Sequence, residues 1–304
     1  MKKTILASCI TILSLFANDY PLIPVHITKD ITCVIGDFNP PMKSNKGFVS
    51  NMCYVNMGDS LVVLDAGPTY IFAKEFYNLM KKEYPNKKVS NVILSNFHDD
   101  RVQGASYFKD LGANIIGYKN INEDIKNNPD KFLRMKMMFS KNILNGTKVI
   151  DADTLVDNGY KIKGSKKTLE ILKLSITSEE NSDIVIYSKD DSFLFTGNII
   201  FNGRMLNYTK NSNIDGWIEA LEGIKNIGAK YVLGGHGKRY DKNSYIPSLE
   251  YLKVLRKNVK DGYDNDIDIE DIKINKNPLV NIKYYKKLNY NNINNYYNQL
   301  EWSE

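Results

Sequence analysis

The chain has 304 residues, 42% of them hydrophobic, so it is long enough to fold around a substantial core as one large or two modest domains. Its formal net charge is +6, and Lys2 and Lys3 at the N-terminus contribute to it. The remaining basic and acidic residues are interspersed, so the composition argues against a disordered chain and against nucleic-acid binding.

The N-terminus predicts export. Lys2 and Lys3 precede an apolar run over residues 4–16, and Ala17 is a small residue where cleavage of a secretory signal peptide is expected. We therefore expect residues 1–17 to be removed and the mature protein to be periplasmic or secreted. No later apolar run approaches the ~20 residues that a membrane-spanning helix needs, so we expect no membrane span.

Cys33 and Cys53 are the cysteines that remain after such a cleavage. They lie in neighbouring segments, residues 28–36 and 48–55, that both have the pattern of a strand. In an oxidising compartment this proximity favours a disulfide. Two buried free thiols explain the same sequence equally well, so both alternatives stay open.

Strand and helix patterns alternate along the chain. Short apolar runs bounded by turns predict strands, and apolar residues spaced three or four apart predict helices. The predicted strands are residues 28–36, 48–55, 60–64, 89–94, 113–117, 149–152, 169–174, 184–187, 193–196 and 230–233. The predicted helices are the segment capped by Thr69, residues 105–111, an insertion within residues 122–146, and the segment around Trp217 that Gly228 ends. This order indicates an α/β fold with two stacked sheets.

The most informative polar segment is residues 95–104, directly after the predicted strand 89–94. Asn96, His98 and Asp100 alternate there, so on an extended backbone an amide oxygen, an imidazole and a carboxylate point to one side. Such groups are possible metal ligands. The alternative is a polar loop in which Asp100 pairs with its neighbouring arginine and His98 is a surface histidine.

The segment Asn-Phe-His-Asp-Asp-Arg at residues 96–101, closed by Gly104, resembles the His-x-His-x-Asp-His signature of metallo-β-lactamase-fold hydrolases. It is most similar to the Asn-x-His-x-Asp-Arg pattern of the mono-zinc carbapenemases in that superfamily. The resemblance implies a four-layer αββα sandwich of metallo-β-lactamase type. It also implies that Asp65, in an Asp-Ala-Gly turn after a strand, orients the site.

Three later residues stand where the superfamily places further metal ligands. Glu179 replaces a histidine. Two alternatives stay open: the register of this acidic loop could be shifted by one residue, or the loop could be an ordinary solvated one. Asn198 replaces an aspartate, and its neutral amide cannot bridge two cations as a carboxylate does. His236, on the glycine loop at residues 234–237, completes the pattern.

The resemblance extends beyond the ligands. Asn45-x-Gly47, Gly216-Trp217 and the closing segment at residues 292–301 are similar to exported zinc metallohydrolases associated with quinoprotein dehydrogenases and sulfur-oxidation systems. It implies a metallo-β-lactamase-like domain over residues 18–262, a C-terminal extension with a docked helix over residues 263–304, and a possible periplasmic redox partner.

Two functions follow from these residues. The first is hydrolysis of an amide, ester or thioester substrate by water activated on one zinc ion, with Asp100 and His236 as main ligands and His98 acting on the water. Asn198, Asn96 and Glu179 would supply weaker ligands. The second is a non-catalytic pseudo-enzyme of the same fold that binds a small molecule or a redox partner. Three histidines in the whole chain exclude a histidine-rich di-zinc centre.

Overall fold

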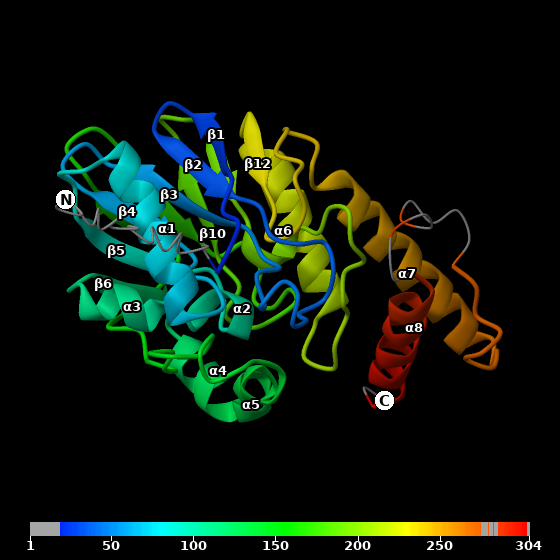
Figure 1. Ribbon diagram of the computed structural model, residues 1–304. Coiled ribbons are helices and arrows are strands. Elements are labelled where there is room, and N and C mark those ends of the chain that lie inside the picture. Colours follow the sequence, from blue (N-terminus) through cyan, green and yellow to red (C-terminus); the bar gives the residue numbers. More distant parts are fainter. Residues whose placement is uncertain (1–18, 275–278, 280–281, 283–284, 303–304) are drawn as a thin grey trace, which may run out of the picture.

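The computed structural model describes residues 19–274, 279, 282 and 285–302, and in it two β-sheets lie face to face with helices on both outer sides (Figure 1). The helices α1 (Tyr70–Glu83) and α3 (Ala105–Asp110) cover one sheet, and α6 (Ile214–Ile227) and α7 (Ile246–Asp264) cover the other. The four layers confirm the predicted αββα sandwich. The predicted signal peptide, residues 1–17, lies outside the described residues.

The first sheet has seven strands in sequence order. They are β1 (Pro24–Thr28), β2 (Ile31–Val34), β3 (Met52–Asn56), β4 (Leu61–Leu64), β5 (Val89–Leu94), β6 (Asn114–Tyr118) and β7 (Thr154–Val156). β1 to β4 pair antiparallel, whereas β4 to β7 pair parallel. The carboxyl ends of β4 and β5 therefore lie at the same edge, where the loops after them meet.

The second sheet has five strands in the order β12-β11-β10-β9-β8. They are β8 (Tyr160–Lys163), β9 (Thr168–Leu172), β10 (Val185–Ser188), β11 (Phe193–Phe195) and β12 (Tyr231–Leu233). All neighbours are antiparallel except β11 and β12. The remaining helical elements are α2 (Asp99–Val102), α4 (Ile121–Asn127), α5 (Pro129–Met138), the 3-10 turn η1 (Gly197–Ile199) and α8 (Tyr285–Glu301).

Three apolar clusters hold the layers together. The central cluster lies between the sheets and includes Val55, Leu64 and Phe195. A second joins the first sheet to α1, and the third joins the second sheet to α6 and α7 through Trp217. Because strand side chains alternate between faces, each sheet contributes to the central cluster and to one outer cluster.

Several local predictions differ from the structure. Residues 149–152 are not a strand, because the Asn122 side chain binds the backbone of Ala152 in place of a neighbouring strand, with Nδ2 to O at 3.2 Å and N to Oδ1 at 2.8 Å. Strands β1, β7 and β8 and helix α7 have no counterpart in the prediction. In β8 a single residue, Ile162, is buried, so its apolar pattern is too short to recognise.

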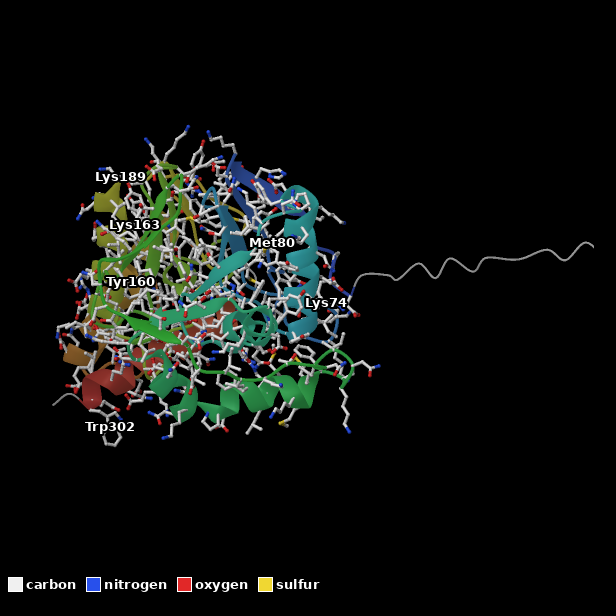
Figure 2. All side chains as sticks on the ribbon, turned by 90° about the vertical axis from the view of Figure 1, so that its left-hand side faces the viewer. Lys74, Met80, Tyr160, Lys163, Lys189 and Trp302 are labelled. Atoms are coloured by element: carbon white, nitrogen blue, oxygen red, sulfur yellow. A yellow bond between two sulfur atoms is a disulfide. The ribbon has the colours of Figure 1, made fainter. Side chains whose placement is uncertain are left out.

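Covalent and ionic contacts fix the edges of the sandwich. Cys33 and Cys53 lie opposite each other on β2 and β3 and form a disulfide. Lys167 is buried and contacts the carboxylates of Asp30 at 3.1 Å and Asp191 at 2.7 Å. The nearby lysines Lys163 and Lys189 project outward in contrast (Figure 2).

At the C-terminal end, α8 packs against α7. The Nδ2 of Asn292 donates to the Oη of Tyr251 at 2.9 Å, and the rings of Tyr263 and Tyr297 meet edge to face at 5.3 Å. Among the described helices, none is both long and apolar enough to cross a membrane.

Candidate functional site

The candidate site lies at the edge of the sandwich where the loops after β4, β5, β11 and β12 meet. Asp65 follows β4 in a left-handed conformation, with φ of 60°. Its carboxylate accepts hydrogen bonds from the backbone N and the Oγ of Ser95, both at 2.7 Å. These bonds join the ends of β4 and β5 and fix where the motif at residues 96–101 begins.

Arg101 lies at the centre of the site and is completely buried. Its Nη1 donates to the Oδ2 of Asp65 at 2.5 Å, and its Nη2 donates to the Oδ1 of Asn198. Burial opposes the charged form, but the carboxylates of Asp65 and Asp100 outweigh it and raise the pKa of Arg101. A buried guanidinium therefore supplies a permanent positive charge between the two sheets.

The glycine loop before His236 is shaped around this guanidinium. A Cβ added to Gly235 would lie 2.0 Å from the Nη2 of Arg101 and 2.5 Å from the carbonyl oxygen of Gly197. Any larger residue at this position would therefore displace the arginine. The absence of a side chain at Gly235 thus leaves room for the guanidinium of Arg101.

The hydrogen bonds of Arg101 determine which ring nitrogen of His98 carries the proton. A guanidinium only donates, so the amide oxygen of Asn198 faces Arg101 and its Nδ2 faces His98. The Nδ1 of His98 accepts from that Nδ2 at 2.8 Å, and its Nε2 lies 3.0 Å from the Oε1 of Glu180. Because Nδ1 accepts, Nε2 carries the proton and donates to Glu180. Both ring nitrogens of His98 are thus engaged within the protein.

Asp100 is directed into the site and is only 5% exposed. Its backbone oxygen accepts from the Oγ of Ser50 at 2.9 Å, whereas its carboxylate accepts no hydrogen bond from any residue that the structure describes. Burial alone would raise its pKa, but the surrounding positive charge, that of Arg101 above all, outweighs burial and lowers the pKa of Asp100 to about 2. At neutral pH this carboxylate is ionised.

His236 lies beside it in the opposite tautomer from His98. Its Nδ1 is 2.8 Å from the backbone oxygen of Val49, which can only accept, so Nδ1 carries the proton and Nε2 has the lone pair. The Nη1 of Arg204 is 3.4 Å from the same Nδ1, but an N–H nitrogen cannot accept, so this contact is not a hydrogen bond. Burial, followed by Arg204 and Arg101, lowers the pKa of His236 well below its usual value, and the ring is neutral.

These side chains surround a cavity of about 160 Å³. Its lining includes five of the six residues predicted as metal ligands: His98, Asp100, Glu179, Asn198 and His236. The sixth, Asn96, is buried behind it, where its Nδ2 donates to the Oδ1 of Asp183 at 3.0 Å and its Oδ1 accepts from the backbone N of His98. Asn96 therefore positions the loop and does not line the cavity.

Arg134 and Arg204 also line the cavity, and the sequence reasoning missed both. Arg134 makes a two-pronged ion pair with Asp99, with both N–O distances at 2.8 Å. It comes from α5, within the predicted helical insertion, and no local pattern indicates that α5 covers the site. Arg204 follows η1 by a few residues, so its proximity to Asn198 in the sequence was the available signal.

A zinc ion does not fit this donor arrangement. Within residues 19–274 and the described part of the C-terminal segment, no three His, Cys, Asp or Glu side chains are grouped so that they could hold a metal ion. Both nitrogens of His98 and both ends of the Asn198 amide are already hydrogen-bonded. Zinc sites use three or four protein ligands, and Asp100 and His236 alone do not reach that number.

Comparison with known proteins identifies the class of protein. The sequence profile described as the Metallo-beta-lactamase superfamily matches residues 45–236, which is more than half of the chain. The chain therefore belongs to the metallo-β-lactamase superfamily and has the fold of its metal-dependent hydrolases.

Among individual proteins, it is 22% identical to the metallo-beta-lactamase type 2 of Elizabethkingia meningoseptica over 260 residues, which is 84% of this chain and 95% of that one. Solved structures show the same fold. A metallo-beta-lactamase from Pontibacter korlensis superposes with a TM-score of 0.62 at 16% identity, covering 76% of this chain and 99% of that chain. The FIM-1 metallo-beta-lactamase of Pseudomonas aeruginosa, in its mono-zinc form, gives 0.62 at 16% identity, covering 78% and 97%.

Proposed function

We propose that this chain is a non-catalytic member of the superfamily that binds a small molecule in the cavity without a zinc ion. One observation carries the proposal: the guanidinium of Arg101 binds Asp65 and Asn198 at the centre of the site. Its positive charge lowers the pKa of Asp100 and partly offsets the rise that burial causes in the pKa of Asp65.

The hydrogen bonds form one continuous chain, from Asp65 through Arg101, Asn198 and His98 to Glu180. Both Nη atoms of Arg101, the Nδ2 of Asn198 and the Nε2 of His98 each have an acceptor, and the amide and imidazole are held in one orientation, although the Nε of Arg101 is buried without a partner among the described residues. Binding a metal through His98 or Asn198 would break this chain and place a second cation beside a buried one. That cost opposes metal binding.

A second candidate is hydrolysis of an amide, ester or thioester with one bound zinc ion. One observation favours it: the Asp100 carboxylate and the neutral His236 both line the cavity, and each has an acceptor that no described residue uses. They are the two ligands that the sequence predicts as the strongest. This candidate needs at least one more ligand, which rotation of His98 away from Asn198 and Glu180 would have to provide.

Two measurements distinguish the non-catalytic function from zinc-dependent hydrolysis. They are elemental analysis of the purified mature protein and hydrolysis assays on p-nitrophenyl acetate and a chromogenic β-lactam. The proposal expects far less than one zinc per chain and no hydrolysis above the rate of an Asp100→Asn variant. One zinc per chain with hydrolysis that a chelator abolishes would support the second candidate instead.

Export to the periplasm and the association with a quinoprotein or sulfur-oxidation partner stay predictions from the sequence. The Cys33–Cys53 disulfide supports export, because such bonds persist in oxidising compartments. Mass spectrometry of the protein from its native host would show loss of about the first seventeen residues if this prediction is right. An intact Met1 would contradict it.

A further inference from the structure

We infer that a groove beside the C-terminal end of α5 binds a single-chain amphiphile with an anionic head group, such as a medium-chain fatty carboxylate. This groove shares no lining residue with the cavity between the sheets. The inference goes beyond the proposed function and does not depend on it. It follows from three features of the groove: its fixed walls, its apolar lining and the charge at its rim.

One wall of the groove is the loop that carries Lys43 and Lys46. The side chain of Asn45 holds this loop in shape, because its Oδ1 accepts from the backbone N of Met42 and of Gly47, both at 3.0 Å. The conformation of the wall is therefore set by the protein itself. A wall that is formed in advance lowers the entropy cost of binding a ligand.

The opposite wall is the end of α5 and the turn that follows it, which lies at the periphery of the sandwich (Figure 1). It is lined by Met137, Met138, Phe139, Ser140 and Ile143. Gly47, with φ of 80°, brings the two walls together, since an added Cβ would lie 2.7 Å from the Cε of Met135 and 3.1 Å from the Cε2 of Phe139. The glycine therefore fixes the width of the groove.

The lining is apolar and leaves space for a ligand. Met137 is 87% exposed, and Met138 and Ile143 are half-buried. The groove has a volume of about 460 Å³, within the range of roughly 300–1,000 Å³ that is usual for small-molecule sites. Apolar side chains exposed in a groove favour a ligand with apolar surface of its own, and the flexible thioether of methionine adapts to an alkyl chain.

The charge at the rim favours an anionic head group. Lys43 is exposed and pairs with no residue that the structure describes, whereas Lys46 forms an ion pair with Asp19 at 2.8 Å. None of the described residues that line the groove is acidic, and residues 131–150, which include the opposite wall, contain no aspartate or glutamate. A lysine lays its apolar stem along an alkyl chain and keeps its ammonium in water, where it meets an anionic head group.

Calorimetric titration with decanoate, hexanoate and decylammonium tests the inference, at low ionic strength and below the concentrations at which micelles form. Decanoate should bind at least tenfold more tightly than hexanoate, because each buried methylene strengthens binding by up to about fourfold. It should bind at least threefold more tightly than decylammonium, a modest factor because the rim charge is exposed. Equal binding of decanoate and hexanoate, or tighter binding of decylammonium, would overturn the inference.

A pair of variants on α5 locates the alkyl chain. Met137→Gln keeps the length of the side chain but makes it polar, so it should weaken decanoate binding at least threefold. Leu133→Gln is the matched control, because Leu133 is exposed on the same helix and does not line the groove, and it should change the affinity less than twofold. Both positions are exposed, so both variants should fold, which circular dichroism checks. Unchanged affinity in Met137→Gln would contradict the proposed site.

A second pair locates the head group. Lys43→Gln should weaken decanoate binding by about twofold to threefold, as expected for an exposed charge, and should not weaken decylammonium binding. Lys136→Gln removes an exposed charge from α5 outside the groove and should change neither affinity by as much as twofold. Equal effects of the two lysine variants on decanoate would show that the net charge of the protein, and not the groove, attracts the anion.

The same samples distinguish two other occupants of the groove. Sedimentation with vesicles of anionic phospholipid tests a membrane surface, and binding to vesicles without any binding of decanoate would overturn the inference. Analytical ultracentrifugation tests a second copy of this chain. A dimer that Met137→Gln dissociates and decanoate does not would assign the groove to that contact and would also overturn the inference.

Discussion

At the scale of single residues, Arg101 determines how the side chains of the site are hydrogen-bonded. Its guanidinium orients the Asn198 amide, which in turn fixes the tautomer of His98 and leaves the acceptors of Asp100 and His236 for a ligand. A lysine at this position would keep the charge but could not donate in two directions from one planar group. Arginine is therefore required by geometry as well as by charge.

Replacing Arg101 by alanine should reduce the free energy of unfolding by about 3–5 kcal/mol, because it leaves the fully buried Asp65 without its cation. Arg101→Lys should lose less. Urea denaturation followed by circular dichroism measures both. The control Arg239→Ala breaks an exposed ion pair with Asp241 and should cost at most about 1 kcal/mol. Equal losses for the two alanine variants would show that Arg101 is not a structural cation.

The sequence predicted the members of the site better than their roles. Residues of the motif at 96–101 are neighbours in the chain, so their common location follows from a strand and a turn. The bonds that decide their roles join Arg101 to residues 36 and 97 positions away. Those partners depend on how the two sheets are packed, which no local pattern contains. Arg134 was missed for the same reason.

At the scale of secondary-structure elements, capping residues and buried ion pairs fix the ends of helices and strands. Asn213 caps α6, and its Oδ1 accepts from the backbone N of Gly216 at 2.7 Å. Gly228 ends the helix in the left-handed conformation, as the sequence predicts. Helix α6 carries Trp217 into the core of the second sheet, so its ends matter for that whole layer.

Asn213→Ala should lower the free energy of unfolding by about 1 kcal/mol through loss of the cap. Asn226→Ala is its matched control, because the same replacement at an exposed position inside α6 should be neutral or stabilise by a few tenths of a kcal/mol, as alanine favours helices. Thermal unfolding of both variants measures the difference. A cost at residue 226 equal to that at residue 213 would contradict the capping role.

The ion pair of Lys167 with Asp30 predicts a dependence of stability on pH. Burial raises the pKa of Asp30, but the hydrogen bond and charge of Lys167 outweigh it and hold the pKa below its usual value. A lowered pKa in the folded state contributes stability above the unfolded pKa of about 3.9, and this stability is lost as the pH falls through the folded value.

Urea denaturation between pH 3 and pH 6 should therefore show wild type losing stability on acidification more steeply than Lys167→Met. The variant itself should be less stable at pH 6, because it leaves two carboxylates without their cation. Parallel pH profiles for the two proteins would show that the ion pair does not contribute.

At the scale of the whole molecule, the alternation of strands and helices was sufficient to predict an α/β fold with two stacked sheets, and the resemblance to the metallo-β-lactamase fold added the αββα order of the layers. The pattern is carried by long apolar runs such as the one that forms β5, and these do not depend on distant contacts. Helix α7 was missed, and of the shorter segments that differ from the prediction, residues 149–152 and 160–163 lie near an edge of a sheet. There, side chains such as Asn122 decide the backbone conformation.

The disulfide between β2 and β3 should be present in the exported protein. Thiol titration of the mature chain, denatured without reductant, is expected to find no free thiol, and reduction should lower the free energy of unfolding by about 3 kcal/mol because the bond closes a loop of some twenty residues. Two titratable thiols in protein from the native host would contradict both the disulfide and the oxidising compartment.

The central claim is that the guanidinium of Arg101, and not a metal ion, supplies the positive charge of the site. Thermal unfolding with added zinc or chelator tests it most directly. A ligand that binds only the folded state at one hundred times its Kd stabilises by about 2.7 kcal/mol, which raises the Tm by roughly 4–5 °C for a chain of this size. Asn198→Asp is the positive control, since its carboxylate adds a charged ligand, and Asn96→Ala is the negative control. We predict no zinc-dependent change in the Tm of wild type or Asn96→Ala and a rise in Asn198→Asp. A rise of several degrees in wild type, reversed by the chelator, would contradict the claim.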